Sequence, residues 1–407
     1  MDADNVAIVN ADGYETKTIE DALDKIFSLL SMNPDNPFAD IVAPGMTVFI
    51  KPNWVASKWR ESCKHRGDIY SVITHPAVIE AVADRVAEAL CGAGRIIIGD
   101  NPSIDADFDE LMELTKIDRL KNKYSVPCEL IDMRPLVCDD LKYYGKKEKM
   151  IEKKGDPRGN TLVDLGEDSM LSEMTPTLFR GVFEERDETV ASHMGGKNLY
   201  TYGRSLYDAD FYISIPKLKT HHKAGVTLNL KGLVGSITNK NQLVHWRVGY
   251  PEVGGDEYPD RESWEIGSRA KVTNRGAWPG NDTIWRMVVD LYTGLMRKDR
   301  KCFGLIDGII AGEGVGPFCP TTKKAGVLIA GHDLVVTDVV ATRLMGLNPE
   351  RIKYLNHYLK NGYTSFDSIK IKSFDYPERQ FFQNGDKYLN FDTADEWKSI
   401  QWRDDIV

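Results

Sequence analysis

The stretch from Phe211 to Ile237, FYISIPKLKTHHKAGVTLNLKGLVGSI, constrains the fold more than any other part of this chain. It opens with five apolar or small residues, Phe211 to Ile215, which predict a buried strand ending at Pro216. Basic residues follow at once: Lys217, Lys219, His221, His222 and Lys223. In α/β proteins ligands bind beyond the carboxyl ends of strands, so the pattern predicts a site for an anion or a polarised carbonyl.

The rest of the chain predicts an α/β fold. Apolar runs indicate strands at 5–10, 46–50, 95–99, 302–306 and 327–330. Periodic patterns indicate five helices, at 18–30, 76–90, 226–237, 281–295 and 334–345. Thr18 is the predicted N-cap of the first helix. Thr74 or His75 is the predicted cap of the second, with Pro76 in its first turn. The strand–helix–strand order from Met46 to Gly99 favours parallel pairing. We expect a mostly parallel sheet with flanking helices and two lobes around a cleft at the strand carboxyl ends.

The chain of 407 residues is long enough for several regions. We expect an N-terminal α/β region at 1–139, a charged insertion or small subdomain at 140–200, and a C-terminal α/β region at 201–407. Within the last region, 240–282 is an irregular, lid-like stretch rich in glycine, aromatic and acidic residues.

The composition limits the kinds of partner that the chain is expected to bind. The net charge of −9 argues against broad nucleic-acid binding, and no apolar run is long enough to span a bilayer. The six cysteines are scattered, which excludes an iron–sulfur motif and predicts isolated thiols in a reducing compartment. With an acidic, polar start and no visible signal peptide, we expect a cytoplasmic protein that binds a small anionic molecule. The oligomeric state is left open.

The first candidate site consists of His221, His222 and Lys231, which we predict to be catalytic. Lys231 has leucine and valine neighbours, and a lysine in apolar surroundings loses its proton more easily, as a base or amine nucleophile requires. Histidine has a pKa near neutrality and suits a general base. The alternative is a Lys231 that extends to solvent beside ordinary loop histidines.

Further polar residues at strand ends or helix starts are predicted to bind substrate. They are Lys51, Asn53, His75, Asp100, Lys217, Lys219, Thr227 and His245. The alternatives are a plain turn at Pro52-Asn53, a capping pair at Thr74-His75, and a solvated or lid histidine at His245.

Asp307 and Glu313 bracket a glycine-rich stretch, 312–317, which we expect to be a loop. Carboxylates in this position suit a divalent metal or the orientation of a histidine, and the alternative for Glu313 is a solvated turn. The stretch matches neither a Walker motif nor GxGxxG, so no nucleotide is inferred. Asp338, inside an apolar helix, is predicted to be a buried partner for a cation, and the alternative is an exposed helix carboxylate.

Several of these segments occur in the order of a known family. They are IKPN at 50–53, THP at 74–76, GD at 99–100, IPKLKTH with VTLNLKGLVG, IDGIIAGEGVGP, and DVVATRLMG at 338–346. Across roughly residues 45 to 350 the chain resembles the domain of unknown function 362 family. Many members carry a ferredoxin-like segment with clustered cysteines, which this chain lacks, so the resemblance implies no iron–sulfur cluster here.

The spacing from His221 to Lys231 is also similar to that in the nickel-dependent lactate racemase family, in which a histidine precedes a lysine by ten positions. There the lysine anchors a nickel pincer cofactor and the histidine assists proton or hydride movement. Gly225 falls at a matching glycine, whereas His222 and the Leu228-Asn229-Leu230 run depart from that pattern. The resemblance adds a nickel pincer-type cofactor to the alternatives.

We therefore expect an enzyme of isomerase or lyase type (epimerase, racemase or lyase) that transfers a proton or hydride on a small anionic, oxygenated substrate. In this hypothesis Lys231 is a second base, an oxyanion stabiliser or a covalent anchor. The rival hypothesis is a non-catalytic protein that binds an anionic metabolite or a polysaccharide precursor. A metal-storage protein is disfavoured because the cysteines are not clustered.

Overall fold

One large sheet forms the centre of the protein. The computed structural model describes residues 3–138, 146, 149–183, 186–270, 276–383, 385–386 and 388–402. In spatial order the strands are β16 (Lys370–Lys372), β1 (Asn5–Asn10), β15 (Cys319–Gly331), β14 (Lys301–Val315), β10 (Phe211–Ile215), β2 (Thr47–Pro52), β3 (Arg95–Asp100) and β4 (Cys128–Asp132). Off this path, β11 (Lys217–His221) pairs with β14, and β12 (Gly225–Val226) pairs with β11.

Most neighbouring strands are parallel, which confirms the predicted fold class. From β14 through β10, β2 and β3 to β4 every pairing is parallel, and β1 and β16 are parallel too. Only β15 among the strands of this path runs antiparallel to its neighbours, β14 and β1. The helix α2 (Pro76–Leu90) supplies the crossover between β2 and β3 that parallel pairing requires. The two-lobe arrangement stays a prediction.

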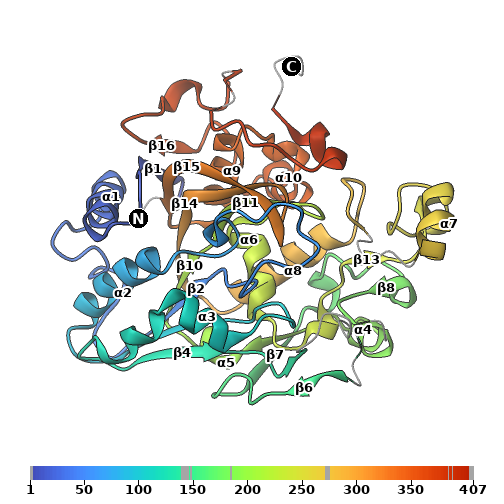
Figure 1. The fold of residues 1–407 in the computed structure, drawn as a ribbon, viewed down its shortest axis with the longest axis horizontal. Helices are drawn as coiled ribbons and strands as arrows, with labels where there is room; N and C mark the ends of the chain where they lie inside the picture. The colour runs from blue at the N-terminus through green and yellow to red at the C-terminus, as the bar shows by residue number, and fades with distance from the viewer. Residues whose placement is uncertain are drawn as a thin grey trace.

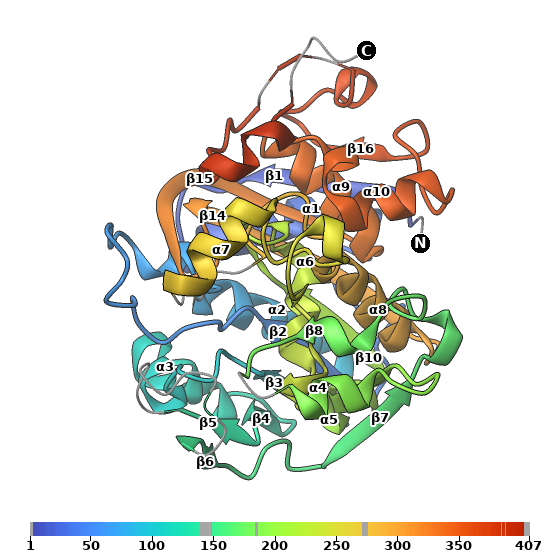
Figure 2. The ribbon, with the colours of Figure 1, turned by 90° about the vertical axis from the view of Figure 1, so that its right-hand side faces the viewer.

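Helices cover both faces of the sheet (Figure 1, Figure 2). On one face Val48 and Ile50 share a core with α1 (Thr16–Leu29) and α2. Phe49, between them in sequence, points to the other core, formed with α6 (Leu228–Gly232), α8 (Ile284–Met296), α9 (Leu334–Leu344) and α10 (Lys353–Lys360). Burial on both faces explains why the strands are continuous apolar runs. Among the described residues, no helix is both long and apolar enough to cross a bilayer.

Several predicted boundaries are confirmed near the amino terminus. The strands at 5–10, 46–50 and 95–99 are β1, β2 and β3. His75 caps α2, because its Nδ1 accepts from the backbone N–H of Ala77 at 3.1 Å, and Pro76 occupies the first turn. The predicted cap of α1 is wrong, since the helix begins before Thr18, with Glu15 at the cap position.

Three segments around the site differ from their predicted structure. The expected glycine loop at 312–317 is largely strand, because β14 continues to Val315 and pairs with β15 along its whole length. The lysine-rich 217–221 segment, expected as a loop, is strand β11, parallel to β14. The expected helix at 226–237 is broken into the short α6 and a 3-10 turn at Leu233–Ser236.

The charged region at 140–200 takes part in small antiparallel pairs that extend beyond its predicted bounds. They are β5 (Leu136–Val137) with β6 (Ile151–Glu152), and β7 (Asn160–Asp164) with β9 (Leu199–Gly203). Residues 139–145, 147–148 and 184–185 lie outside the described part. Pairing of β8 (Phe179–Arg180) with β13 (Trp246–Arg247) joins this region to the 240–282 stretch, whose helix α7 (Arg261–Ala270) projects at the edge of the molecule (Figure 1). The domain boundaries stay predictions.

The prediction that all the cysteines are isolated thiols is wrong. Cys63 and Cys319 form a disulfide across 256 positions of sequence, while Cys91, Cys128, Cys138 and Cys302 are free. The bond fastens the polar loop after β2 to the start of β15. A cytoplasmic location therefore stays a prediction without the support of the cysteines.

Candidate functional site

A buried ion pair joins the carboxyl ends of β2 and β3. The Nζ of Lys51 lies 2.6 Å from Oδ1 of Asp100. Backbone N–H groups of Trp54 and Asn101 donate to the same carboxylate at 2.7 and 2.8 Å. Adjacent parallel strands place both residues at one edge of the sheet. The pair is thus a satisfied part of the site before any ligand binds.

Gly235 lies directly on this ion pair. A Cβ at this position would lie 2.1 Å from Oδ1 of Asp100 and 2.7 Å from Nζ of Lys51. Lys231 is four residues earlier in the same helical segment, and residues at this spacing share a face. Glycine at 235 therefore lets the segment that carries Lys231 approach the ion pair.

Lys231 has no hydrogen-bond or ion-pair partner within the described part of the chain, although it is only 7% exposed. This low exposure argues against the interpretation that its amine extends freely to solvent. Burial, and then the charge of Lys51, lower the pKa of Lys231 to about 8. A substantial fraction of the amine is therefore neutral near physiological pH, as a base or nucleophile requires.

His221 is held in one tautomer. Its Nδ1 accepts from the backbone N–H groups of Lys223 at 3.0 Å and Ala224 at 3.3 Å. Burial, with the charge of Lys231 next, holds the pKa of His221 well below its usual value, so the ring is neutral. The proton of this neutral ring must therefore be on Nε2, which can donate a hydrogen bond.

His245 is held in the opposite tautomer. Its Nδ1 lies 2.8 Å from the carbonyl oxygen of Leu243, and since a carbonyl only accepts, Nδ1 carries the proton. Burial, followed by the charges of Lys223 and Lys231, lowers the pKa of His245 to about 3. Its Nε2 therefore presents a lone pair, the complement of the donor on His221.

His222 and Lys223 connect this group to the surrounding chain. The backbone N–H of His222 donates to Gly316 at 2.9 Å, while its buried Nδ1 has no partner among the described residues. Burial, then the charge of Lys223, lowers the pKa of His222 to about 3. The Nζ of Lys223 lies 4.7 Å from the ring centre of Trp246, in a cation–π contact.

Lys240 completes the group from the 240–282 stretch. Its Nζ donates to the carbonyl of Asn101 at 3.0 Å, and burial lowers its pKa to about 7. Its charge also acts on His245. We call this group the Lys/His site and define it by its members: His221, His222, Lys223, Lys231, Lys240 and His245.

A second cluster surrounds Asp307 in β14. Lys217 is fully buried, and its Nζ lies 2.5 Å from Oδ2 of Asp307 and 3.0 Å from the carbonyl of Ile310. The hydroxyl of Tyr14 donates to Oδ1 of Asp307 at 2.8 Å, and the backbone N–H of His75 donates to Oδ2 at 2.9 Å. With these partners, Lys217 and Asp307 are occupied by protein groups.

The imidazole of His75 is packed against Tyr14. The two rings stack with centres 3.7 Å apart and planes 12° apart. Burial lowers the pKa of His75 to about 4, so the ring is neutral, as its capping role with Nδ1 as acceptor requires. These contacts favour a structural role for His75.

Asn53 and Lys219 meet at the carbonyl of Val72. The amide of Asn53 donates to this oxygen at 2.9 Å, and the Nζ of Lys219 donates to it at 2.7 Å. Lys219 also donates to the carbonyl of Pro317 at 3.3 Å. Burial holds the pKa of Lys219 well below its ordinary value. Both side chains fix the loop after β2 to β11.

The start of α6 is a strained turn. Leu228 has a φ of 50°, in the left-handed region that disfavours a branched side chain. Asp338 accepts from the backbone N–H groups of Asn229 and Leu230, both at 2.9 Å, and so holds the turn. Asp338 is buried, as predicted, but no lysine or arginine of the described structure pairs with it. The hydroxyl of Thr227, one residue before the strained position, is buried without a partner in the described structure.

Asp307 and Glu313 do not share a site. They are six residues apart on β14, and a strand rises ~3.3 Å per residue, which separates them by roughly 20 Å. Glu313 instead accepts from Lys323 and from the backbone of Asp392, both at 2.9 Å. Within the described ranges no group of three or more His, Cys, Asp or Glu side chains fits a metal ion.

Many of the predicted site residues fall into two groups, while Asn53 and Lys219 meet at Val72 and Glu313 lies apart beside Lys323. Lys51 and Asp100 adjoin Lys231 in the Lys/His site, whereas Lys217, Asp307 and His75 form the cluster around Tyr14. Sequence reasoning assigned no role to Gly235, Tyr14 or Lys240. The sequence contains a signal for two of them. Gly235 lies four residues after Lys231, and Lys240 is the first residue of the lid-like stretch.

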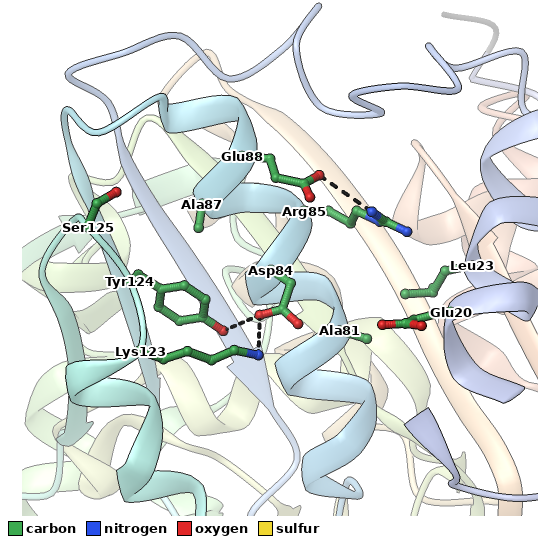
Figure 3. Close-up of a pocket in the computed structure, with 10 residues that line it drawn as sticks. All are labelled: Glu20, Leu23, Ala81, Asp84, Arg85, Ala87, Glu88, Lys123, Tyr124 and Ser125. Carbon is green, nitrogen blue, oxygen red and sulfur yellow. Dashed lines mark hydrogen bonds and ion pairs between the residues drawn. The ribbon is translucent and has the colours of Figure 1, made fainter. Parts of the chain in front are cut away.

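Two surface hollows lie away from these side chains. One, of about 440 Å³, lies between α1 and α2 and is lined by Asp84, Lys123 and Tyr124 among others (Figure 3). In it Lys123 and Tyr124 point to Asp84, at 2.6 and 2.8 Å, so these polar groups are already paired. The other, of about 620 Å³, adjoins α10 and the segment after it. Neither includes a member of the Lys/His site.

Comparison with known proteins identifies relatives of this chain. A family model described as Domain of unknown function (DUF362) matches residues 48–154 and 144–343. A thylakoid-associated protein of Synechocystis sp. is 22% identical over 349 residues, which are 86% of this chain and 76% of that protein.

Two solved structures show a distant likeness. A protein of Thermotoga maritima has a TM-score of 0.40 at 10% identity, over 86% of this chain and 60% of that one. The lactate racemase apoprotein of Thermoanaerobacterium thermosaccharolyticum has a TM-score of 0.38 at 10% identity, over 84% and 56%. The chain thus spans less than two thirds of either structure, and likeness at these scores carries no argument about activity.

Proposed function

The chain belongs to the Domain of unknown function (DUF362) family, and from this premise we propose that it is an enzyme that moves a proton at a carbon bearing oxygen. The reaction class is that of a racemase, epimerase or lyase, and the substrate is a small anionic, oxygenated molecule. The observation that supports this most is Lys231, a side chain only 7% exposed whose amine has no protein partner in the described structure and whose pKa is lowered to about 8.

The two histidines of opposite tautomer support the same proposal. We assign to Nε2–H of His221 a hydrogen bond to a substrate oxygen, and to the lone pair on Nε2 of His245 a hydrogen bond from a substrate hydroxyl. Lys231, whose pKa of about 8 lies near physiological pH, then takes the proton as the base or stabilises a developing oxyanion. General acid–base groups of this kind contribute about 10²–10⁴-fold to a rate.

Solvent exchange tests the proposal without knowledge of the substrate. The protein is incubated in D₂O with small hydroxy acids, keto acids and sugar acids, and loss of C–H signals is followed by NMR. We expect exchange with one class, reduced about 100-fold or more in Lys231→Ala. Lys58→Ala is the matched control, since Lys58 pairs with Glu110 on the surface. Exchange that is equal in Lys231→Ala and wild type would contradict the proposal.

The rival function, binding without turnover, predicts a different result. Lys231→Arg keeps the positive charge but removes the nucleophile and the tunable pKa. In an enzyme of the proposed kind, this variant loses turnover and retains ligand. In a binding protein it retains ligand, and wild type turns nothing over.

Lys231 also suits a covalent attachment point for a cofactor, which is our second candidate role for it. The donor set of the described residues does not fit a metal centre, so we assign no step to a metal. Intact mass and metal content of wild type beside Lys231→Ala decide between these roles. Extra mass that disappears in the variant supports an anchor, and the bare chain mass in both leaves Lys231 as an acid–base group.

A further inference from the structure

Lysines outnumber carboxylates in the Lys/His site. The charges of Lys223, Lys231 and Lys240 each act on the ring of His245, and Lys51 acts on Lys231. The nearby carboxylates within the described structure are Asp100, Glu257 and Asp132, of which Asp132 is paired with Arg134. Lys219 also lies close to Lys231. Five lysines therefore face two carboxylates that are left to neutralise them, and three positive charges have no protein counterpart when all the lysines are protonated.

Both carboxylates are already engaged. Asp100 accepts from Lys51 and from the backbone N–H groups of Trp54 and Asn101. Oε2 of Glu257 accepts from the backbone N–H of Gly249 at 3.2 Å. Neither is positioned to neutralise Lys231, which lacks a partner in the described chain.

Buried cations without a counter-charge are costly, and a protein can respond in two ways. The lysines can lose protons, or an anion can occupy the site. The first response is visible in the lowered pKa values, about 7 for Lys223 and Lys240 and about 8 for Lys231, for which burial is the largest cause. The second requires a ligand that supplies negative charge.

We propose that the Lys/His site binds a ligand with two negative charges on oxygen, as in a phosphate monoester or a dicarboxylate, and takes up protons as the ligand binds. This rests on the proposed function and names its substrate class. Two negative charges offset most of the positive charge that the protein leaves uncompensated. The Nε2–H of His221 and the unpaired hydroxyl of Thr227 add neutral donors for the oxygens of the ligand.

The direction of the proton transfer follows from the charges. In the empty site at pH 8, lysines with a pKa of about 7 or 8 are partly neutral. A bound dianion favours the charged form and raises these values, so protons are taken up from solution. Below about pH 6 the lysines are protonated already, and uptake disappears.

Other charged or titratable groups face these lysines and are included in this balance. They are Lys51, Asp100, Asp132 and Arg134 from the β2, β3 and β4 side, Lys219, His221 and His222 from β11 and its turn, and His245 and Glu257 from the 240–282 stretch. Asp132 and Arg134 pair with each other at 2.6 Å and cancel. The histidines are neutral in the pH range of the proposed uptake.

Calorimetry at pH 8 in two buffers of different ionisation enthalpy tests the proposal on the full chain. The probes are inorganic phosphate, succinate and, as a monoanion, acetate. We expect one of the dianions to bind about tenfold or more tightly than acetate at pH 8, with uptake of about one proton or more per site. After subtraction of the protons that phosphate or succinate itself releases on binding as a dianion, this uptake should fall toward zero at pH 6. Tighter binding of phosphate would indicate a phosphate monoester as the ligand, and tighter binding of succinate would indicate a dicarboxylate.

Lysine variants test whether the dianion binds at the Lys/His site. Lys231→Met and Lys223→Met are expected to weaken dianion binding about tenfold and to reduce uptake, whereas Lys58→Met leaves both unchanged. Circular dichroism checks that each variant folds, and the wild-type uptake is decisive even if one does not.

Equal binding of acetate and the dianions, or binding without proton uptake, would overturn the inference. If either result were found while wild type still catalysed C–H exchange in D₂O, the inference about the ligand would be wrong and the proposed function would remain supported. Absence of both anion binding and exchange would overturn the two together.

Discussion

The backbone of Gly235 lies on the ion pair of Lys51 and Asp100, so that a single methyl group at 235 would overlap the carboxylate. We predict that Gly235→Ala separates this pair and lowers stability by about 1–3 kcal/mol, the usual effect of overpacking. Activity should fall with it, because the same segment carries Lys231.

Gly232 provides the matched control for that change. It lies in the same segment, with negative φ, and a Cβ there would meet no atom within 4 Å. Gly232→Ala should be neutral or slightly stabilising, by about 0.5–1 kcal/mol, since alanine favours helix. Urea denaturation measures both variants, and equal midpoints for the two would show that the close approach at 235 is wrong.

The fully buried pair of Lys217 and Asp307 should tolerate loss of one partner poorly. Lys217→Met leaves the carboxylate with Tyr14 and a backbone amide but without its cation, and we expect a loss of about 3–5 kcal/mol. Lys58→Met breaks an exposed pair and should cost no more than about 1 kcal/mol. A small effect of Lys217→Met in thermal unfolding would mean that this cation is dispensable.

The disulfide between Cys63 and Cys319 should stabilise the turn that touches the site. Next to Cys319, the carbonyls of Gly316 and Pro317 accept from His222 and Lys219. We predict that a reductant, or Cys63→Ser, lowers stability by about 2–4 kcal/mol and speeds amide exchange at 219–222. Cys91→Ser, at an exposed free thiol, is the control. Unchanged amide hydrogen exchange at 219–222 would show that the disulfide does not stabilise the site.

Much of the sheet could be predicted because its strands are apolar runs buried on both faces. The carboxyl-edge position of Lys51, Asp100 and Lys217 follows from that pattern alone. The structure of 217–221 could not be predicted, because lysines at such spacing are atypical of a buried strand. Each ammonium there finds a partner from distant sequence, such as Asp307 or the carbonyl of Val72.

Details of the candidate site depend on contacts that a sequence does not encode locally. The tautomers of His221 and His245 are set by backbone groups two residues away, in turns whose geometry is fixed by tertiary packing. The stacking of Tyr14 on His75 joins segments 61 residues apart. The Cys63–Cys319 bond likewise requires the fold, since spacing alone pointed to isolated thiols.

Acid should unfold the protein through its buried histidines. His222 and His245 have pKa values lowered to about 3, chiefly by burial, against 6.5 in the unfolded chain. Between these values the unfolded state binds more protons, so stability is full above about pH 6.5 and is lost as pH falls toward 3, by at most about 5 kcal/mol per histidine. His245→Gln removes one such group, and its melting temperature should fall less steeply between pH 6.5 and 4 than that of wild type. His65→Gln, at an exposed position, should reproduce the wild-type slope, and a His245→Gln slope equal to it would mean that His245 is not buried neutral.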